Sequence, residues 1–171
     1  MNYNKIIFYD TGNAKGLSTV LFVQGCTNNC RHCHNPETHN FKGGKPFTNK
    51  EIQMILSSFN NNHVKNLVIS GGDPCHQNNL IDITELAIRV KNFYPNINII
   101  VYTGYTLEEL QNRNSETFKS LEKNIDYLID GKYIEEQAVK GIDYRGSYNQ
   151  RCFHFICGSP IIDENYFLLK E

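Results

Sequence analysis

The sequence of 171 residues predicts an α/β fold, because short apolar runs alternate with segments of helical periodicity. Four of these runs are mostly rich in Val, Ile or Leu, as in strands that are buried on both faces. They are Ser18–Val23, Val64–Ser70, Ile97–Thr103 and Ile125–Asp130. Strands that alternate with helices indicate a parallel sheet, and right-handed connections would place the helices outside it. We therefore expect a mostly parallel sheet that forms an open partial (β/α) barrel, since so few strands cannot close one.

Four helices are expected between and after these strands. Residues 48–60 form the first, because they open on the capping-box sequence Thr-Asn-Lys-Glu and place apolar side chains on one face. Residues 79–92 repeat this spacing. A threonine cap at Thr106 begins a third helix, and Phe118 with Leu121 indicates a short fourth.

Composition and charge fit one domain that spans residues 1–171. A chain of this length buries about 70% of its unfolded surface. The net charge of −1 and the lack of basic runs give no attraction for nucleic acid or for an anionic membrane. No apolar segment approaches the roughly 18 residues that cross a bilayer, and the amino terminus lacks the apolar stretch of a signal peptide. We expect a cytoplasmic protein.

Three cysteines follow the first apolar run closely, at Cys26, Cys30 and Cys33. Thiolates are preferred ligands of zinc and of iron-sulfur clusters. A structural zinc site usually has two pairs of ligands, and no second Cys-x2-Cys pair follows here. Zinc with His32 or His34 as a fourth ligand stays open, as do three reduced structural thiols. A four-iron cluster held by three cysteines would leave one iron free to bind a ligand.

The other three cysteines are Cys75, Cys152 and Cys157. Six cysteines would allow three disulfides, but reducing cytosol favours metal ligands or free thiols. We expect these three to be ordinary thiols.

A second motif, Gly71-Gly72-Asp73-Pro74, follows the second apolar run. Paired glycines let a ligand approach the backbone, since no side chain intervenes, and an acid beside them suits a ligand ammonium. Glycine and proline also mark ordinary turns, so the tetrapeptide alone would indicate a turn. Its position favours a site shared with the cysteines, because ligands of open parallel sheets bind beyond the carboxyl ends of the strands.

Polar residues end the third and fourth runs too. Thr103 can offer a hydroxyl to a ribose, and Asp130 can accept from a ribose or bind a cation, although turn chemistry explains both equally well. Residues 144–151 then carry two arginines, the second of them Arg151, before a last expected strand at Phe153–Ile156. An arginine fork can clamp a carboxylate, but a solvated loop would have the same composition.

The cysteine spacing and the Gly-Gly-Asp motif together resemble the signature of the radical S-adenosylmethionine (SAM) superfamily. With the segments 102–105, 129–133 and 145–151, the match extends over residues 6–151 and is similar to the glycyl-radical-enzyme activases that activate anaerobic ribonucleoside-triphosphate reductase. Two positions depart from that family. Residues 12–18 stand where it usually has a Gly-Pro-Gly-x-Arg-like stretch, and His32 stands where it often has an aromatic residue.

The resemblance implies a truncated radical-SAM core in which Cys26, Cys30 and Cys33 hold a [4Fe-4S] cluster. We expect SAM to be bound by six residues, the first three by resemblance and the others by position: Gly71, Gly72, Asp73, Thr103, Asp130 and Arg151. Reductive cleavage of SAM would give methionine and a 5′-deoxyadenosyl radical, which would take a hydrogen atom from a glycine on the large subunit of the reductase. The implied partners are that subunit and a flavodoxin-like or other one-electron donor. No general acid or base is required, so no catalytic side chain is assigned.

Two other functions fit parts of the sequence. A small radical-SAM enzyme that acts on a carboxylated metabolite, as 7-carboxy-7-deazaguanine synthase does, would also use an arginine-bearing segment. A zinc-stabilised binding module would use the same cysteines without catalysis. The sequence leaves open the target glycine, the oligomeric state and the roles of His32, His34, Lys132 and Arg145.

Overall fold

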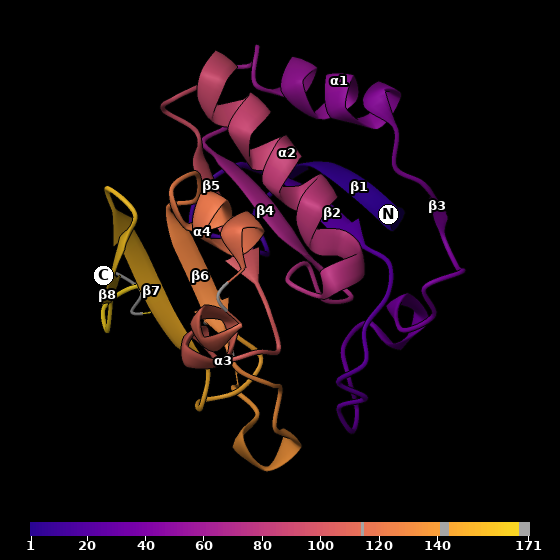
Figure 1. Ribbon diagram of the computed structural model, residues 1–171, viewed down its shortest axis with the longest axis vertical. Helices are drawn as coiled ribbons and strands as arrows, with labels where there is room; N and C mark the ends of the chain where they lie inside the picture. The colour runs from indigo at the N-terminus through magenta and orange to yellow at the C-terminus, as the bar shows by residue number, and fades with distance from the viewer. Residues whose placement is uncertain (114, 141–143, 168–171) are drawn as a thin grey trace.

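The computed structural model describes residues 1–113, 115–140 and 144–167. The strands within these residues form one eight-stranded sheet and are β1 (Asn2–Asp10), β2 (Ser18–Val23), β3 (Lys45–Pro46), β4 (Asn66–Gly71), β5 (Asn98–Tyr102), β6 (Tyr127–Asp130), β7 (Arg151–Ile156) and β8 (Ser159–Ile162). The helices are η1 (Pro36–Thr38), α1 (Asn49–Ser58), α2 (Gln77–Phe93), α3 (Leu107–Asn112), α4 (Glu116–Glu122) and η2 (Glu135–Gln137). Helices α2 and α4 lie against one face of the sheet (Figure 1).

The order of strands across the sheet is β3-β1-β2-β4-β5-β6-β7-β8, and the sheet is open, with β3 and β8 at its edges. The four central strands, β2, β4, β5 and β6, run parallel to one another. The expectation of a mostly parallel sheet is wrong, because four of the seven neighbouring pairs among the described residues are antiparallel. Antiparallel neighbours can be joined by a tight turn, as β7 and β8 are.

All four predicted strands are present and form the parallel centre. Alternate side chains of these strands pack on opposite faces, so that Leu21 and Ile69 join the large core under the helices. Val20 and Val68 join a smaller core on the other face, which also contains Tyr166 near the carboxyl end of the chain. Burial on both faces explains why these strands read as continuous apolar runs.

The predicted helix starts are confirmed by their caps. Thr48 begins α1 with a reciprocal capping box that includes Glu51, and Thr106 begins α3 with the same arrangement and Glu109. Helix α2 begins at Gln77, two residues before its predicted start. These caps satisfy backbone N–H groups that have no partner within the helix.

The strands missed by the sequence lie at the sides of the sheet. The residues of β1 are only partly buried, and most of β8 is exposed, so neither shows a run of apolar core positions. The last strand, predicted at Phe153–Ile156, is β7, which begins two residues earlier, at Arg151. It is followed by β8, which was not predicted. In the part of the chain that the structure describes, no helix is both long and apolar enough to cross a membrane.

Candidate functional site

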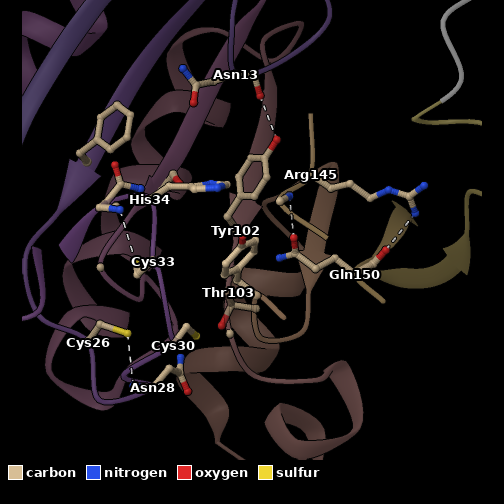
Figure 2. Close-up of a pocket in the computed structure, with 18 of the residues that line it drawn as sticks. Asn13, Cys26, Asn28, Cys30, Cys33, His34, Tyr102, Thr103, Arg145 and Gln150 are labelled. Atoms are coloured by element: carbon tan, nitrogen blue, oxygen red, sulfur yellow. Dashed lines mark hydrogen bonds between the residues drawn. The ribbon is translucent and has the colours of Figure 1, made fainter. Parts of the chain in front are cut away.

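A cavity of about 630 Å³ lies at the carboxyl ends of the central parallel strands. All three clustered cysteines line it, and so do the two glycines of the Gly-Gly-Asp motif and Thr103. Figure 2 shows the cysteines on one side of this cavity and Arg145 with Gln150 on the other, with Tyr102 between them. The structure thus brings to one cavity segments that are 124 positions apart in the chain, at residue 26 and residue 150.

The cysteine loop leaves β2 through Gly25, whose φ of +99° is a conformation that favours glycine. A Cβ atom there would lie 2.1 Å from the ring of Phe41, so no other residue fits. The Gly25 N–H donates to the Thr38 carbonyl at 2.7 Å, and the Cys26 N–H donates to the His39 carbonyl at 3.1 Å. These bonds fold residues 26–38 into a closed loop over the sheet edge.

Two of the three sulfurs accept backbone hydrogen bonds inside this loop. The Asn28 N–H donates to Cys26 Sγ at 3.4 Å, and the Asn35 N–H donates to Cys33 Sγ at 3.4 Å. Hydrogen bonds of this kind are among the factors that set the potentials of iron-sulfur clusters. Burial raises the pKa of Cys26 and that of Cys30, and a nearby thiol raises each further. Metal binding must therefore displace thiol protons.

The donor set of this loop fits an iron-sulfur cluster, because three soft sulfur ligands border one cavity. In a cubane cluster each cysteine binds a different iron, so the ligands surround the cluster and do not meet at one ion. Among residues 1–113, 115–140 and 144–167, no group of three or more His, Cys, Asp and Glu side chains is arranged to hold a single metal ion.

The two glycines Gly71 and Gly72 let the end of β4 run directly against the cysteine loop. Gly71 has a φ of +99°, and a Cβ atom on it would lie 2.8 Å from the Val23 backbone. A Cβ atom on Gly72 would lie 2.5 Å from the Gly25 carbonyl oxygen. The Gly72 N–H donates to the Val23 carbonyl at 2.9 Å. Both glycines serve close packing and also border the cavity.

Asp73 is buried, with 1% of its surface exposed, and it does not line the cavity. Its Oδ1 accepts from the Cys75 N–H at 3.0 Å and the Thr103 hydroxyl at 2.8 Å. Its Oδ2 accepts from Asn28 Nδ2 at 2.8 Å and the Gly104 N–H at 3.1 Å. Burial raises the pKa of Asp73, and these four hydrogen bonds oppose that rise. The carboxyl group thus joins the loops that follow β2, β4 and β5.

Asp130 and Arg151 are paired with each other and lie away from the cavity lining. Asp130 is 1% exposed and also accepts from the Leu107 N–H at 2.8 Å. The Arg151 guanidinium donates to both carboxylate oxygens of Glu108, at 3.0 and 2.7 Å. Asp130, Arg151 and Glu108, which we call the Asp130 group, thus connect α3 to the end of β6 and to the start of β7.

Tyr102 lies in segment 102–105 of the family resemblance, but no sequence pattern marked it as a site residue. The Tyr102 hydroxyl oxygen lies 2.9 Å from the Asn13 carbonyl oxygen and 2.5 Å from the Tyr144 carbonyl oxygen, and the two acceptors share its one hydrogen. It therefore ties two loops, one before β2 and one before β7, over the cavity (Figure 2). Burial raises the pKa of Tyr102 well above its usual value, so the hydroxyl stays a donor.

The cysteine loop also contacts the connection between β6 and β7. Glu135 forms a hydrogen bond with His32 Nδ1 and an ion pair with Arg31 at 3.2 Å. His34 packs on Tyr133, with ring centroids 4.8 Å apart, and both rings line the cavity. His32 and His34 thus link neighbouring segments, and no sequence pattern marked Glu135 or Tyr133 as their partners.

Two of the remaining residues of interest have defined surroundings. The Arg145 guanidinium lies over the rings of Phe167 and Tyr148, at 4.3 and 5.2 Å from their centroids. Lys132 accepts a hydrogen bond at its carbonyl from Asn149 Nδ2 at 2.8 Å. Arg145 is part of the cavity lining, and its guanidinium donates to the Tyr148 and Gln150 carbonyls at 3.5 and 3.4 Å.

The other three cysteines are free thiols. Cys75 and Cys152 are buried, and burial raises the pKa of each thiol. Cys157 is exposed in the turn between β7 and β8. None of these three lines the cavity that the clustered cysteines border.

Comparison with known proteins shows the family of this chain. Residues 12–153 match a family described as a 4Fe-4S single cluster domain. The anaerobic ribonucleoside-triphosphate reductase-activating protein of Vibrio cholerae is 38% identical over 157 residues, which cover 91% of this chain and 99% of that protein. The protein of the same name from Escherichia coli K12 is 35% identical over 90% of this chain and 99% of that protein. The one from Enterobacteria phage T4 is 36% identical over 88% of this chain and 92% of that protein. The chain therefore belongs to the family of anaerobic ribonucleoside-triphosphate reductase-activating proteins and carries a single-cluster 4Fe-4S domain.

Proposed function

We propose that this protein is a radical-SAM activase that cleaves SAM reductively and generates a glycyl radical on the large subunit of anaerobic ribonucleoside-triphosphate reductase. The observation that carries this proposal is the single cavity bordered by Cys26, Cys30, Cys33 and the Gly71-Gly72 turn. The bound cluster and SAM would supply one-electron cleavage of a carbon–sulfur bond, and the resulting 5′-deoxyadenosyl radical would take a hydrogen atom from a glycine.

Cys26, Cys30 and Cys33 would each bind one iron of the cluster and leave the fourth iron free for SAM. Their loop is held on both sides, by the bonds from Gly25 and Cys26 to the residues after η1 and by the packing of Gly72 against Gly25. Such a loop orients its sulfurs before a cluster is bound, which reduces the entropy lost on binding.

Gly71, Gly72 and Thr103 would contact SAM, because they border the cavity on the side next to the cysteines. The Thr103 hydroxyl donates to Asp73, so a ligand would meet its oxygen as an acceptor. Both arginines have partners in the protein, since Arg151 pairs with Asp130 and Glu108, and the Arg145 guanidinium lies over the rings of Phe167 and Tyr148. Arg145 belongs to the cavity lining and Arg151 does not, so we propose that Arg145, once turned from these rings, meets the SAM carboxylate.

The protein substrate would enter through the open side of this cavity. The site lies at the carboxyl ends of the central strands of an open sheet and not in a closed barrel, which suits a glycine loop of the large subunit. We further propose that residues 1–171 are one domain with a truncated, partial-barrel radical-SAM core, and that it takes its electron in the cytoplasm from a flavodoxin-like or other one-electron donor.

Anaerobic reconstitution tests the cluster assignment. Protein loaded with iron and sulfide should show a reduced-cluster signal in electron paramagnetic resonance (EPR) that changes shape when SAM is added. Cys26→Ala, Cys30→Ala and Cys33→Ala should each abolish the change, while Cys157→Ala, a matched change at an exposed cysteine outside the cavity, should keep it. Tightly bound zinc without acid-labile sulfide would contradict the proposal.

Activation of the partner is tested separately. The reduced protein, SAM and the reductase large subunit should together give a glycyl-radical EPR signal on the large subunit, with about one 5′-deoxyadenosine formed per radical. SAM cleavage without any radical on the partner would refute the activase assignment and leave the cluster assignment standing.

A further inference from the structure

We propose that Asp73 is a positioning residue that acts through Asn28 to fix the cysteine loop, and that it does not itself bind SAM. The inference deepens the proposed function, on which it rests for the identity of the cluster and of SAM. It assigns a role to Asn28, which stands between the first two cysteines, and it changes the role expected for the acid of the Gly-Gly-Asp motif.

The Asp73 carboxylate has no acceptor site left for a ligand. An ionised carboxylate offers about four lone-pair positions on its two oxygens. Four donors already fill them, two on each oxygen, at 2.8 to 3.1 Å. With 1% of its surface exposed, Asp73 could accept from a SAM ammonium only by losing one of these bonds and opening its surroundings.

Asn28 connects this buried carboxylate to the first cysteine. Its side-chain Nδ2 donates to Asp73 Oδ2 at 2.8 Å, and its backbone N–H donates to Cys26 Sγ at 3.4 Å. Asn28 also lines the cavity beside the cysteines (Figure 2). Asn28 thus bonds to the Asp73 carboxylate with its side chain and to the sulfur of Cys26 with its backbone.

The glycine after Thr103 shows that this contact is built into the fold. A Cβ atom on Gly104 would lie 2.1 Å from Asn28 Nδ2, so any side chain there would displace the Asn28 amide. The Gly104 N–H itself donates to Asp73. Asp73, Asn28 and Gly104, which we call the Asp73 clamp, therefore form one packed unit.

The clamp has a defined chemical consequence. Partners that orient metal ligands typically change metal affinity about 10- to 100-fold when they are removed. Hydrogen bonds to cluster sulfurs also affect the potential of a cluster. Loss of the Asn28–Asp73 bond should therefore alter the cluster even when no SAM is present.

The test compares Asn28→Ala and Asp73→Asn in reconstituted full-length protein without SAM. Each variant should change the EPR spectrum of the reduced cluster and should lose iron to a chelator about 10-fold faster than wild type. Both changes disrupt the Asn28–Asp73 bond, so the effect of the double variant should be smaller than the sum of the two single effects. Gly104→Ala should act in the same way and provides a second route if Asp73→Asn does not fold.

Two control variants separate this effect from general destabilisation. Asn124→Ala removes an amide that donates to the Ser120 carbonyl at 2.8 Å at the end of α4. Asp126→Asn changes an acid that accepts from the Ile99 N–H at 2.7 Å, at the other end of the parallel strands. Both should keep the wild-type cluster spectrum and iron-loss rate.

One set of results would contradict the proposed role of Asp73. If Asn28→Ala and Asp73→Asn both keep the wild-type spectrum and iron-loss rate, while Asp73→Asn alone weakens SAM binding, Asp73 is a direct SAM contact and the proposal is wrong. Failure of the proposed function would look different, because wild-type protein would then hold a cluster that does not respond to SAM. The comparison without SAM would still decide the role of the clamp.

Discussion

Asp73 and Asp130 invite comparison, because each lies at the carboxyl end of a central parallel strand and each is 1% exposed. Asp73 accepts from uncharged donors on the loops around the cavity. Asp130 accepts from a guanidinium and from the first residue of α3. The same sequence signal, an acid at a strand end, thus serves the arrangement of the site in one case and the attachment of a helix in the other.

The largest effect on stability should come from Asp130→Ala. Removing one partner of a buried ion pair typically costs about 3–5 kcal/mol, and the exposure of Arg151 reduces this to about 2–3 kcal/mol. Urea unfolding followed by circular dichroism would measure the loss. The reduced cluster should keep its wild-type EPR spectrum after reconstitution. A changed spectrum would mean that the two aspartates do not differ in the way described.

A smaller loss is expected for Gly104→Ala, which alters the surroundings of Asp73 without changing its carboxylate. The added Cβ atom would displace the Asn28 amide, and because Asn28 is only partly buried, the lost hydrogen bond to a charged acceptor costs about 1.5 kcal/mol. Unlike Asp130→Ala, this variant should change the cluster spectrum. Gly158→Ala, at a glycine in the β7–β8 turn, is the matched control and should affect stability alone. If Gly104→Ala keeps the wild-type cluster spectrum, the surroundings of Asp73 do not affect the cluster, and Asp73 and Asp130 do not differ as described.

The smallest effect concerns the pH dependence of the Asp130 group. Hydrogen bonds from Arg151 lower the pKa of Glu108 to about 2. Because the unfolded value is about 4.3, this pair stabilises the folded state above about pH 4.3, and the contribution is lost as the pH falls towards about 2. Glu108 is largely exposed, so screening keeps the contribution below about 1 kcal/mol. Glu108→Gln should flatten the unfolding free energy over this range.

Urea midpoints of Glu108→Gln and wild type at several pH values would measure that change. Glu85→Gln is a suitable control, since Glu85 pairs with Arg89 on the surface of α2 and lies away from Asp130, Arg151 and Glu108. If Glu108→Gln keeps the full acid sensitivity of wild type, the Glu108–Arg151 pair does not contribute to folding.

The parts of the fold that could be predicted are those in which local sequence and burial agree. The central strands are buried on both faces, so their apolar runs were visible, and Thr48 and Thr106 carry caps that depend only on nearby residues. Strands β1 and β8 are held in the sheet by pairing with β2 and β7. They are partly exposed, so no continuous apolar run indicates them in the sequence. The antiparallel sides of the sheet were missed for that reason.

The site shows the same limit. The cysteine spacing and the paired glycines are local patterns, and the structure places both at one cavity. What surrounds an acid is decided by distant residues, as in the bond between Asp73 and Asn28, 45 positions apart. Sequence reasoning therefore found Asp73 and Asp130 but could not tell that neither lines the cavity.

The central claim is that the cavity beside the cysteine loop holds a cluster with one iron open to SAM. Electron-nuclear double resonance of the reduced wild-type protein, with SAM that carries ¹⁵N at its amino group, tests this most directly. The account predicts a hyperfine coupling between the cluster and that nitrogen, present in Cys157→Ala and absent when Cys26, Cys30 or Cys33 is changed to alanine. A cluster that forms in the wild-type protein but shows no coupling to bound SAM would contradict it.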